Sequence, residues 1–257
     1  MKKVLYSLGI SVAFIALAAC SSSKTSNGSD MTDQIWMLAE LNGNQLVAGS
    51  TISAMFTQDG KISGSAGCNR YMGSYQISGS TISISSTLAT TMMMCESSLM
   101  NQEKVYLKAL QEAKSYSIKA DQLSLMDAGG KVLVTYQAQN QGLAGTSWEV
   151  IAYNNGKQAV TSVLAGTTLS ADFGEDGTLS GSSGCNSYSG SYKLDGKNIS
   201  IGPLVSTKMY CGEPAGAMDQ ETQFLLALES GKAYVVEGNA LELRTQDGAL
   251  AVDLIRK

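Results

Sequence analysis

The chain has 257 residues, with 18 basic and 22 acidic side chains and a net charge of −4. This acidic balance, with no run of Lys or Arg, argues against nucleic acid as a partner, because phosphates require clustered basic groups. The sequence contains no histidine, so the commonest general base and the usual zinc ligand are missing. P-loop and dinucleotide fingerprints are also missing. We therefore expect a protein that is not an enzyme and that needs no cofactor or metal.

Residues 1–19 have the layout of a lipoprotein signal peptide. Two lysines precede an uncharged, mostly apolar run that ends in Leu17-Ala18-Ala19-Cys20. The run is short for a transmembrane span, and small residues directly before a cysteine resemble the lipobox of bacterial lipoproteins. We expect cleavage before Cys20 and acylation of the mature N-terminus, for example by palmitate, with each buried methylene contributing about 0.8 kcal/mol. Ser21 in place of Asp predicts sorting to the outer membrane, facing the periplasm.

An ordinary signal peptide that ends near a cysteine is the alternative interpretation of this segment. In either case, residues 20–31 are rich in Ser, Lys, Thr, Asn and Gly, which predicts a flexible tether. Such a tether spans roughly 20 Å on average, so the first domain would lie close to its membrane.

The remainder of the chain repeats one pattern. Phe-x-x-Asp-Gly occurs at 56–60 and 173–177, and Gly-Cys-Asn-x-Tyr-x-Gly-Ser-Tyr occurs at 67–75 and 184–192. Identities at a nearly constant offset indicate a tandem duplication, and each copy is long enough to bury its own core. We therefore predict two domains, at 32–139 and 145–257, joined by a linker at 140–144.

Each copy has a mainly β pattern. Apolar and polar residues alternate at 81–85 and 198–201, as in strands with one buried face, and Asn-Gly and Asp-Gly turns separate such segments. The stretches 99–113 and 218–230 instead place their apolar side chains on one helical face. The sequence predicts two small antiparallel β-barrels, each with eight or nine strands and one helix that covers an end of the barrel.

Each copy also contains two cysteines. Four cysteines permit three pairings, and the symmetry of the repeat favours Cys68–Cys95 and Cys185–Cys211. Disulfides persist in an exported chain, and each would contribute roughly 3.5 kcal/mol on the chain-entropy model. A redox pair or a zinc site is a weaker alternative, because the chain has neither Cys-x-x-Cys nor histidine.

The Gly-Cys-Asn element has two interpretations. Its Asn can bond its own turn and its tyrosines can close the barrel end. Alternatively, a ligand pocket or contact surface is lined by Tyr71, Tyr75, Tyr188 and Tyr192. The tryptophans that open each copy, Trp36 and Trp148, are expected to plug the barrels.

Three consecutive methionines, Met92-Met93-Met94, suggest a copper(I) site because thioether sulfur suits that soft ion. The second copy has Lys208-Met209-Tyr210 at this place, and histidine support is missing. Core packing and edge contacts are therefore the favoured use of these methionines.

The repeated motifs, including the Gln-Glu that precedes each apolar helix, resemble the META domain, the family of the HslJ-type envelope proteins. The resemblance implies a mainly β, lipocalin-like barrel with one helix, and no catalytic mechanism. It links the chain to envelope stress, drug tolerance and secretion. One departure lies at 214–216, where Pro-Ala-Gly precedes the second helix and the first copy has Ser-Ser-Leu, so the two helices should begin differently.

Three functions remain open at this point. The first is a lipid-anchored envelope protein whose two domains contact other proteins in stress or assembly. The second is a carrier of a small ligand inside a barrel, and the third is an unrecognised hydrolase with paired carboxylates. A wide apolar barrel mouth would favour the carrier, whereas a barrel filled by its own side chains would favour protein contacts.

Overall fold

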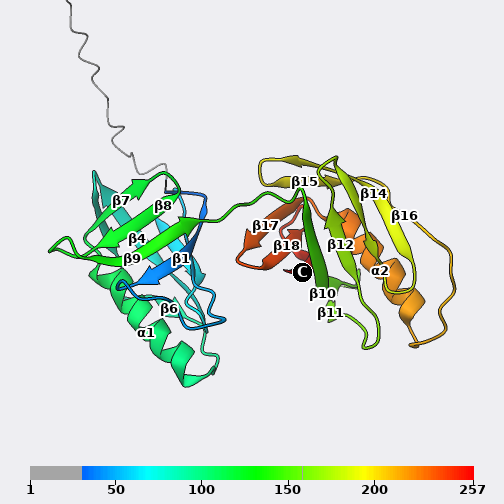
Figure 1. The fold of residues 1–257 in the computed structure, drawn as a ribbon, viewed down its shortest axis with the longest axis horizontal. Coiled ribbons are helices and arrows are strands. Elements are labelled where there is room, and N and C mark those ends of the chain that lie inside the picture. Colours follow the sequence, from blue (N-terminus) through cyan, green and yellow to red (C-terminus); the bar gives the residue numbers. More distant parts are fainter. Residues whose placement is uncertain (1–30, 158) are drawn as a thin grey trace, which may run out of the picture.

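The computed structural model describes residues 31–157 and 159–257, so the predicted signal peptide, Cys20 and nearly all of the predicted tether lie outside the described residues. As predicted, the structure is mainly β and forms two barrels, each with one helix (Figure 1). The elements of the first domain are β1 (Ile35–Leu41), β2 (Ser53–Phe56), β3 (Lys61–Ser65), β4 (Arg70–Ser78), β5 (Thr81–Ile84), β6 (Ala89–Thr90), α1 (Ser97–Glu112), β7 (Ser115–Lys119), β8 (Gln122–Met126) and β9 (Val132–Ala138).

The first barrel closes on itself. Its strands follow the order β3-β2-β1-β9-β8-β7-β5-β4, and β4 pairs back with β3, so eight of the described strands form a ring. β6 pairs only with β4, outside that ring. The weakest join is between β5 and β7, which share a single register pair, Thr81 with Ser115. Closure removes the free edges through which open sheets aggregate.

The second barrel repeats this topology. Its elements are β10 (Thr146–Asn154), β11 (Val160–Ser162), β12 (Ser170–Phe173), β13 (Thr178–Ser182), β14 (Ser187–Asp195), β15 (Asn198–Ile201), β16 (Val205–Ser206), α2 (Ala217–Ser230), β17 (Ala233–Glu237), β18 (Ala240–Arg244) and β19 (Leu250–Arg256). β10 pairs with β19 to close the ring, while β11 and β16 lie outside it. β15 and β17 share only the pair Asn198 with Ala233.

Both barrel interiors are filled by side chains. Alternation along the strands sends every second residue inward, and the inward residues are apolar or aromatic. Trp36 and Trp148 are 1% and 0% exposed, which confirms that they belong to the core. The largest fully buried side chains also include Phe56, Tyr106, Tyr136, Phe173 and Phe224.

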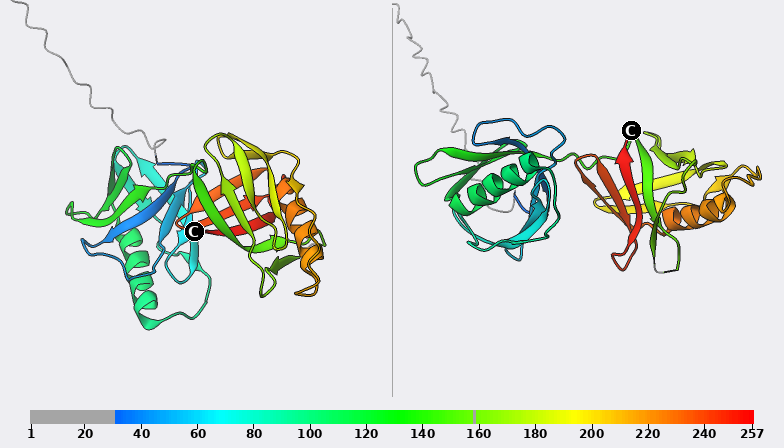
Figure 2. Two further views of the ribbon diagram at one scale, coloured as in Figure 1. Left: turned by 45° about the vertical axis from the view of Figure 1, so that its right-hand side comes forward. Right: turned by 90° about the horizontal axis from the view of Figure 1, so that it is seen from below.

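The two helices pack on equivalent parts of the two barrels. α1 contacts β5 and β9, and α2 contacts β10, β15 and β19 (Figure 2). They begin differently, as expected: Glu96 precedes α1 in an extended conformation, whereas Gly216 precedes α2 with φ of 90°, a conformation that favours glycine. Within residues 31–157 and 159–257, neither helix is long and apolar enough to cross a membrane.

The turn between β7 and β8 offers a stability prediction. Ala120 has φ of 52°, and the matching position between β17 and β18 is Gly238 with φ of 63°. Because a Cβ is strained in this region, we expect Ala120→Gly to stabilise the first domain by about 1 kcal/mol. Urea unfolding would measure the change, with Ala128→Gly in the next turn as the matched control. Equal effects of the two substitutions would contradict the assignment of strain to Ala120.

Candidate functional site

The Asn of the repeated Gly-Cys-Asn element is buried and holds three segments of its domain together by hydrogen bonds. We call this Asn, with the helix Glu and the loop backbone that it bonds, the Asn latch. In the second domain the Asn186 side chain is held on both sides of its amide. Nδ2 donates to Glu221 Oε1 and to the carbonyl of Met209, both at 3.0 Å. Oδ1 accepts from the backbone N–H of Met209 at 2.7 Å and from Thr207 Oγ1 at 2.6 Å. This one side chain therefore joins the turn between β13 and β14, the loop after β16 and α2.

Glu221 completes the latch from α2. Its Oε2 accepts hydrogen bonds from the Asn186 backbone N–H at 3.0 Å and from Ser183 Oγ at 2.7 Å. Both Asn186 and Glu221 are buried, at 2% and 7% exposed. Because buried charge is stable only when it is fully hydrogen-bonded, these contacts are what permit a carboxylate at this place.

The first domain has the same latch. Asn69 Nδ2 donates to Glu103 Oε1 at 3.0 Å, and Asn69 Oδ1 accepts from the N–H of Met93 at 2.7 Å. The sequence interpretation, that Asn bonds its own turn, is thus incomplete, because the side chain reaches the helix and a distant loop. The repeated Gln-Glu at the start of each helical stretch was the signal for Glu103, but its partner could not be read from spacing.

The predicted disulfides are confirmed. Cys68 bonds Cys95 and Cys185 bonds Cys211, each with Cα atoms 5.9 Å apart. Each disulfide lies beside the corresponding Asn and closes the same loop. The three residues between latch and disulfide, Met92–Met94, are here named the methionine loop, and their counterparts form the 208–210 loop.

The four tyrosines of the repeated element are buried in their own barrels. This agrees with the interpretation that they serve the barrel structure, and it corrects the alternative of a ligand pocket or contact surface. They are 2–7% exposed. Their hydroxyls donate to backbone carbonyls of their own barrel, as for Tyr71 to Ser53 and Tyr188 to Ser170. Burial raises the pKa of both phenols well above the ordinary value, so both stay protonated as donors. The set comprises Tyr71, Tyr75, Tyr188 and Tyr192.

The methionine loop lies at the surface, which corrects the expectation of core packing. Its side chains are 97%, 57% and 91% exposed in chain order. In the 208–210 loop, Met209 is 61% and Tyr210 84% exposed. Each domain therefore presents apolar side chains on a loop that a disulfide and a buried Asn hold in place.

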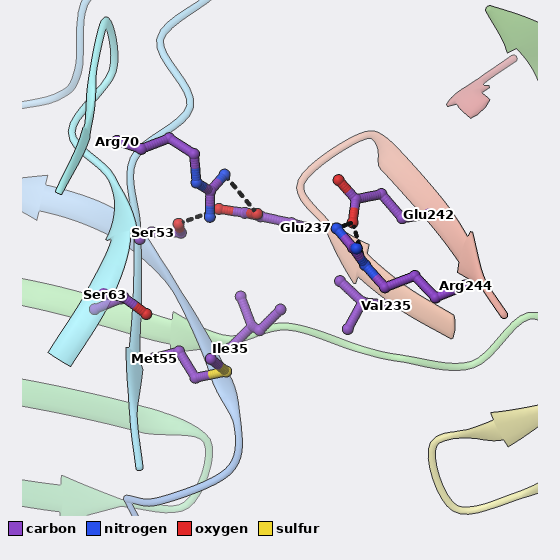
Figure 3. Close-up of a pocket in the computed structure, with 11 residues that line it drawn as sticks. Ile35, Ser53, Met55, Ser63, Arg70, Val235, Glu237, Glu242 and Arg244 are labelled. Atoms are coloured by element: carbon purple, nitrogen blue, oxygen red, sulfur yellow. Dashed lines mark hydrogen bonds and ion pairs between the residues drawn. The ribbon is translucent and has the colours of Figure 1, made fainter. Parts of the chain in front are cut away.

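A second surface lies between the two domains, where a cleft of about 340 Å³ is lined by β1–β4 on one side and by β17 and β18 on the other (Figure 3). Glu237 crosses it: its Oε2 lies 3.2 Å from Arg70 Nη1, and its Oε1 accepts from Ser53 Oγ. Arg244 pairs within its own domain, with Nη2 2.6 Å from Glu242 Oε2. The charged groups of the cleft thus partner one another.

The linker also joins the domains. Gln141 donates from Nε2 to the carbonyl of Val236 at 2.7 Å, and its Oε1 accepts from the N–H of Val236 at 2.8 Å. Gln139 Oε1 accepts from the N–H of Gly238 at 3.2 Å. These side chains occupy the edge of β17 that β15 leaves uncovered. The facing surfaces have diverged: Arg70 and Glu237 correspond to Ser187 and Lys119 in the other copy.

Because Glu237 reaches across the cleft, we expect Glu237→Ala to weaken coupling between the domains by about 1 kcal/mol, a modest value since Arg70 is largely exposed. Calorimetry should show the two unfolding transitions moving apart. The matched control is Glu242→Ala, which lies in the same cleft but pairs within one domain. Equal separation in both variants would show that the bond to Arg70 and Ser53 does not couple the domains.

The described residues offer little catalytic chemistry. No group of three His, Cys, Asp or Glu within them is placed to hold a metal. Glu242 and Asp253 lie opposite each other on β18 and β19, but neither is fully buried and Glu242 already pairs with Arg244. Partial burial, followed by the charge of Glu242, raises the pKa of Asp253.

The sequence matches one family model, and the structure has low similarity to a few solved structures. The META domain model matches the chain twice, at residues 29–140 and 141–255. A protein from Burkholderia xenovorans, solved by NMR, is 27% identical over 45% of this chain and 83% of its own, with a TM-score of 0.38. A DUF4847 family protein from Bacteroides vulgatus is 16% identical over 45% of this chain and 99% of its own, with a TM-score of 0.34. No curated protein matches.

Proposed function

The chain belongs to the META domain family, in two tandem copies, and from this we propose that it is a non-enzymatic envelope protein whose domains bind another protein. The observation that supports this proposal is the filled interior of both barrels, where inward side chains occupy the space that a carrier would need for its ligand. In addition, no buried side-chain nitrogen or oxygen within residues 31–157 and 159–257 lacks a hydrogen-bond partner. No buried polar side chain in that part of the chain is therefore left for a ligand to satisfy.

The proposed contact surface is the methionine loop together with the 208–210 loop. Methionine and tyrosine are side chains that protein interfaces favour, because they combine large apolar area with adaptable or amphipathic contact. In both loops the backbone is already fixed by a disulfide and an Asn latch, so binding costs little backbone entropy. Such preorganised apolar loops support protein contact over ligand transport.

In this proposal the protein is anchored to the bacterial outer membrane by acylated Cys20 and faces the periplasm. Its role there is in envelope stress or assembly, as the family resemblance implies. Cys20→Ser should release the protein from membranes without changing its unfolding midpoint. Membrane association that persists in this variant would count against the anchor.

Native mass spectrometry of the full chain, released gently from membranes of the producing cell, tests the function. We expect a stoichiometric protein complex without any small-molecule mass. Met94→Ser with Tyr210→Ser should abolish the complex, whereas Leu226→Ser, on an equally apolar exposed site of α2, should preserve it. A retained small molecule would replace protein contact with the carrier function, and a complex that survives the paired substitution would move the contact surface elsewhere.

A further inference from the structure

We propose that the methionine loop is the site at which this protein reacts with two-electron oxidants, namely peroxides and hypohalous acids. The modification is conversion of Met92 and Met94 to methionine sulfoxide. It would turn an apolar loop into a polar one and so regulate the contact surface, a consequence that rests on the proposed function.

Exposure singles out these two side chains. Met92 and Met94 are 97% and 91% exposed, against 63% for Met72 and 61% for Met209. At the other extreme, Met31 is fully buried. Because oxidation of a thioether requires access to its sulfur, susceptibility follows exposure. The rate of oxidation should therefore fall in this order.

The other readily oxidised side chains of the described residues are either bonded or buried. Cys68, Cys95, Cys185 and Cys211 are all consumed in disulfides. Both tryptophans of the chain lie in the cores, at no more than 1% exposed, and the sequence has no histidine. Among the described residues, thioethers are thus the most oxidisable groups that an incoming oxidant meets, and the methionine loop holds the most accessible of them.

The loop can accept oxygen without disturbing the barrel. The backbone of Met93 is held by Asn69, whose Oδ1 accepts from its N–H at 2.7 Å and whose Nδ2 donates to its carbonyl at 3.4 Å. Cys95 fixes the next turn of chain through its disulfide. Since only the exposed side chains of Met92 and Met94 change, the fold should persist after oxidation.

The chemical step is an oxygen-atom transfer. A sulfur lone pair attacks the peroxide oxygen, the S–O bond forms as the O–O bond breaks, and water leaves after proton transfer. Sulfur loses two electrons and the peroxide gains them. With hypochlorous acid, sulfur attacks chlorine and the Cl–O bond breaks to release hydroxide. Water then displaces chloride from the chlorosulfonium, and loss of two protons gives the same sulfoxide. Sulfoxide is reduced back by thiol-dependent reductases, so the modification is reversible. Burying the new S–O dipole against an apolar partner costs free energy, which weakens contact.

The test is a hydrogen peroxide titration of the folded, disulfide-bonded mature chain, followed by peptide mapping. We expect Met92 and Met94 to oxidise about twofold faster than Met72 and Met209, and about tenfold or more faster than Met31. Circular dichroism should not change. If Met72 or Met209 oxidises first, or if all methionines oxidise together, the site assignment is wrong.

A second arm separates regulation from reactivity. The control Met92→Leu with Met94→Leu keeps the loop apolar but removes its two most exposed sulfur atoms. Peroxide should lower the affinity of the wild-type chain for its protein partner about tenfold and leave the affinity of the leucine variant unchanged. Equal dissociation in both would overturn the switch. A chain that forms no complex at all would instead overturn the proposed function, and the mapping would still decide the reactive site.

Discussion

Asn186→Leu should destabilise the second domain by about 3 kcal/mol or more. The substitution removes the Nδ2 donor of Glu221 and leaves that carboxylate 7% exposed with fewer hydrogen bonds. It also leaves the N–H of Met209 without the acceptor that orders its loop. Urea unfolding followed by Tyr or Trp fluorescence, analysed as two transitions, would measure the loss.

Two controls make this prediction specific. Adding Glu221→Leu to Asn186→Leu should recover part of the loss, because no buried charge is then unpaired. Asn69→Leu should cost less in the first domain, since Glu103 is only partly buried. No recovery in the double variant would mean that the buried carboxylate is not the source of the effect.

Replacing Cys68 and Cys95 together by Ser should destabilise the first domain by about 3.5 kcal/mol, since the disulfide closes a loop across a sequence separation of 27. The second domain keeps its own disulfide and its own core, so it should stay folded. Limited proteolysis would show loss of residues 31–138 before loss of the second barrel. Simultaneous loss of both would mean that the contacts at Glu237 and Gln141 merge the two barrels into one cooperative unit.

The repeat and the alternation in the sequence were sufficient to predict the architecture. Apolar residues at every second position of each strand, together with turn signals at matching places, predict the β-barrels, and the duplication places the cysteines in symmetric pairs. The sequence could not predict which polar side chains contact each other. Asn186 and Glu221 are 35 positions apart, and only the packing of α2 on the barrel brings them together.

The methionines and tyrosines show the same limit. Apolar residues suggest a core, yet Met92 is almost fully exposed, on a loop that ends at a disulfide-bonded cysteine. Tyr71 was open to two interpretations, a barrel-closing residue or part of a pocket or contact surface, and strand alternation sends it inward to the carbonyl of Ser53. The cleft between the domains could not be predicted from the repeat, because Arg70 and Glu237, which pair across it, are Ser187 and Lys119 at the matching positions of the other copy.

The glutamines of the linker change where the second domain begins. By sequence repetition it starts near residue 145, but Gln139 and Gln141 supply hydrogen bonds to the edge of β17 that β15 leaves uncovered and to the turn that follows it. A second domain produced from residue 145 onward would leave Val236 with unsatisfied main-chain groups on a strand edge, and such edges recruit other chains. Soluble expression of that domain alone therefore requires a start at or before Gln139, so the folding unit is longer than the unit that was duplicated.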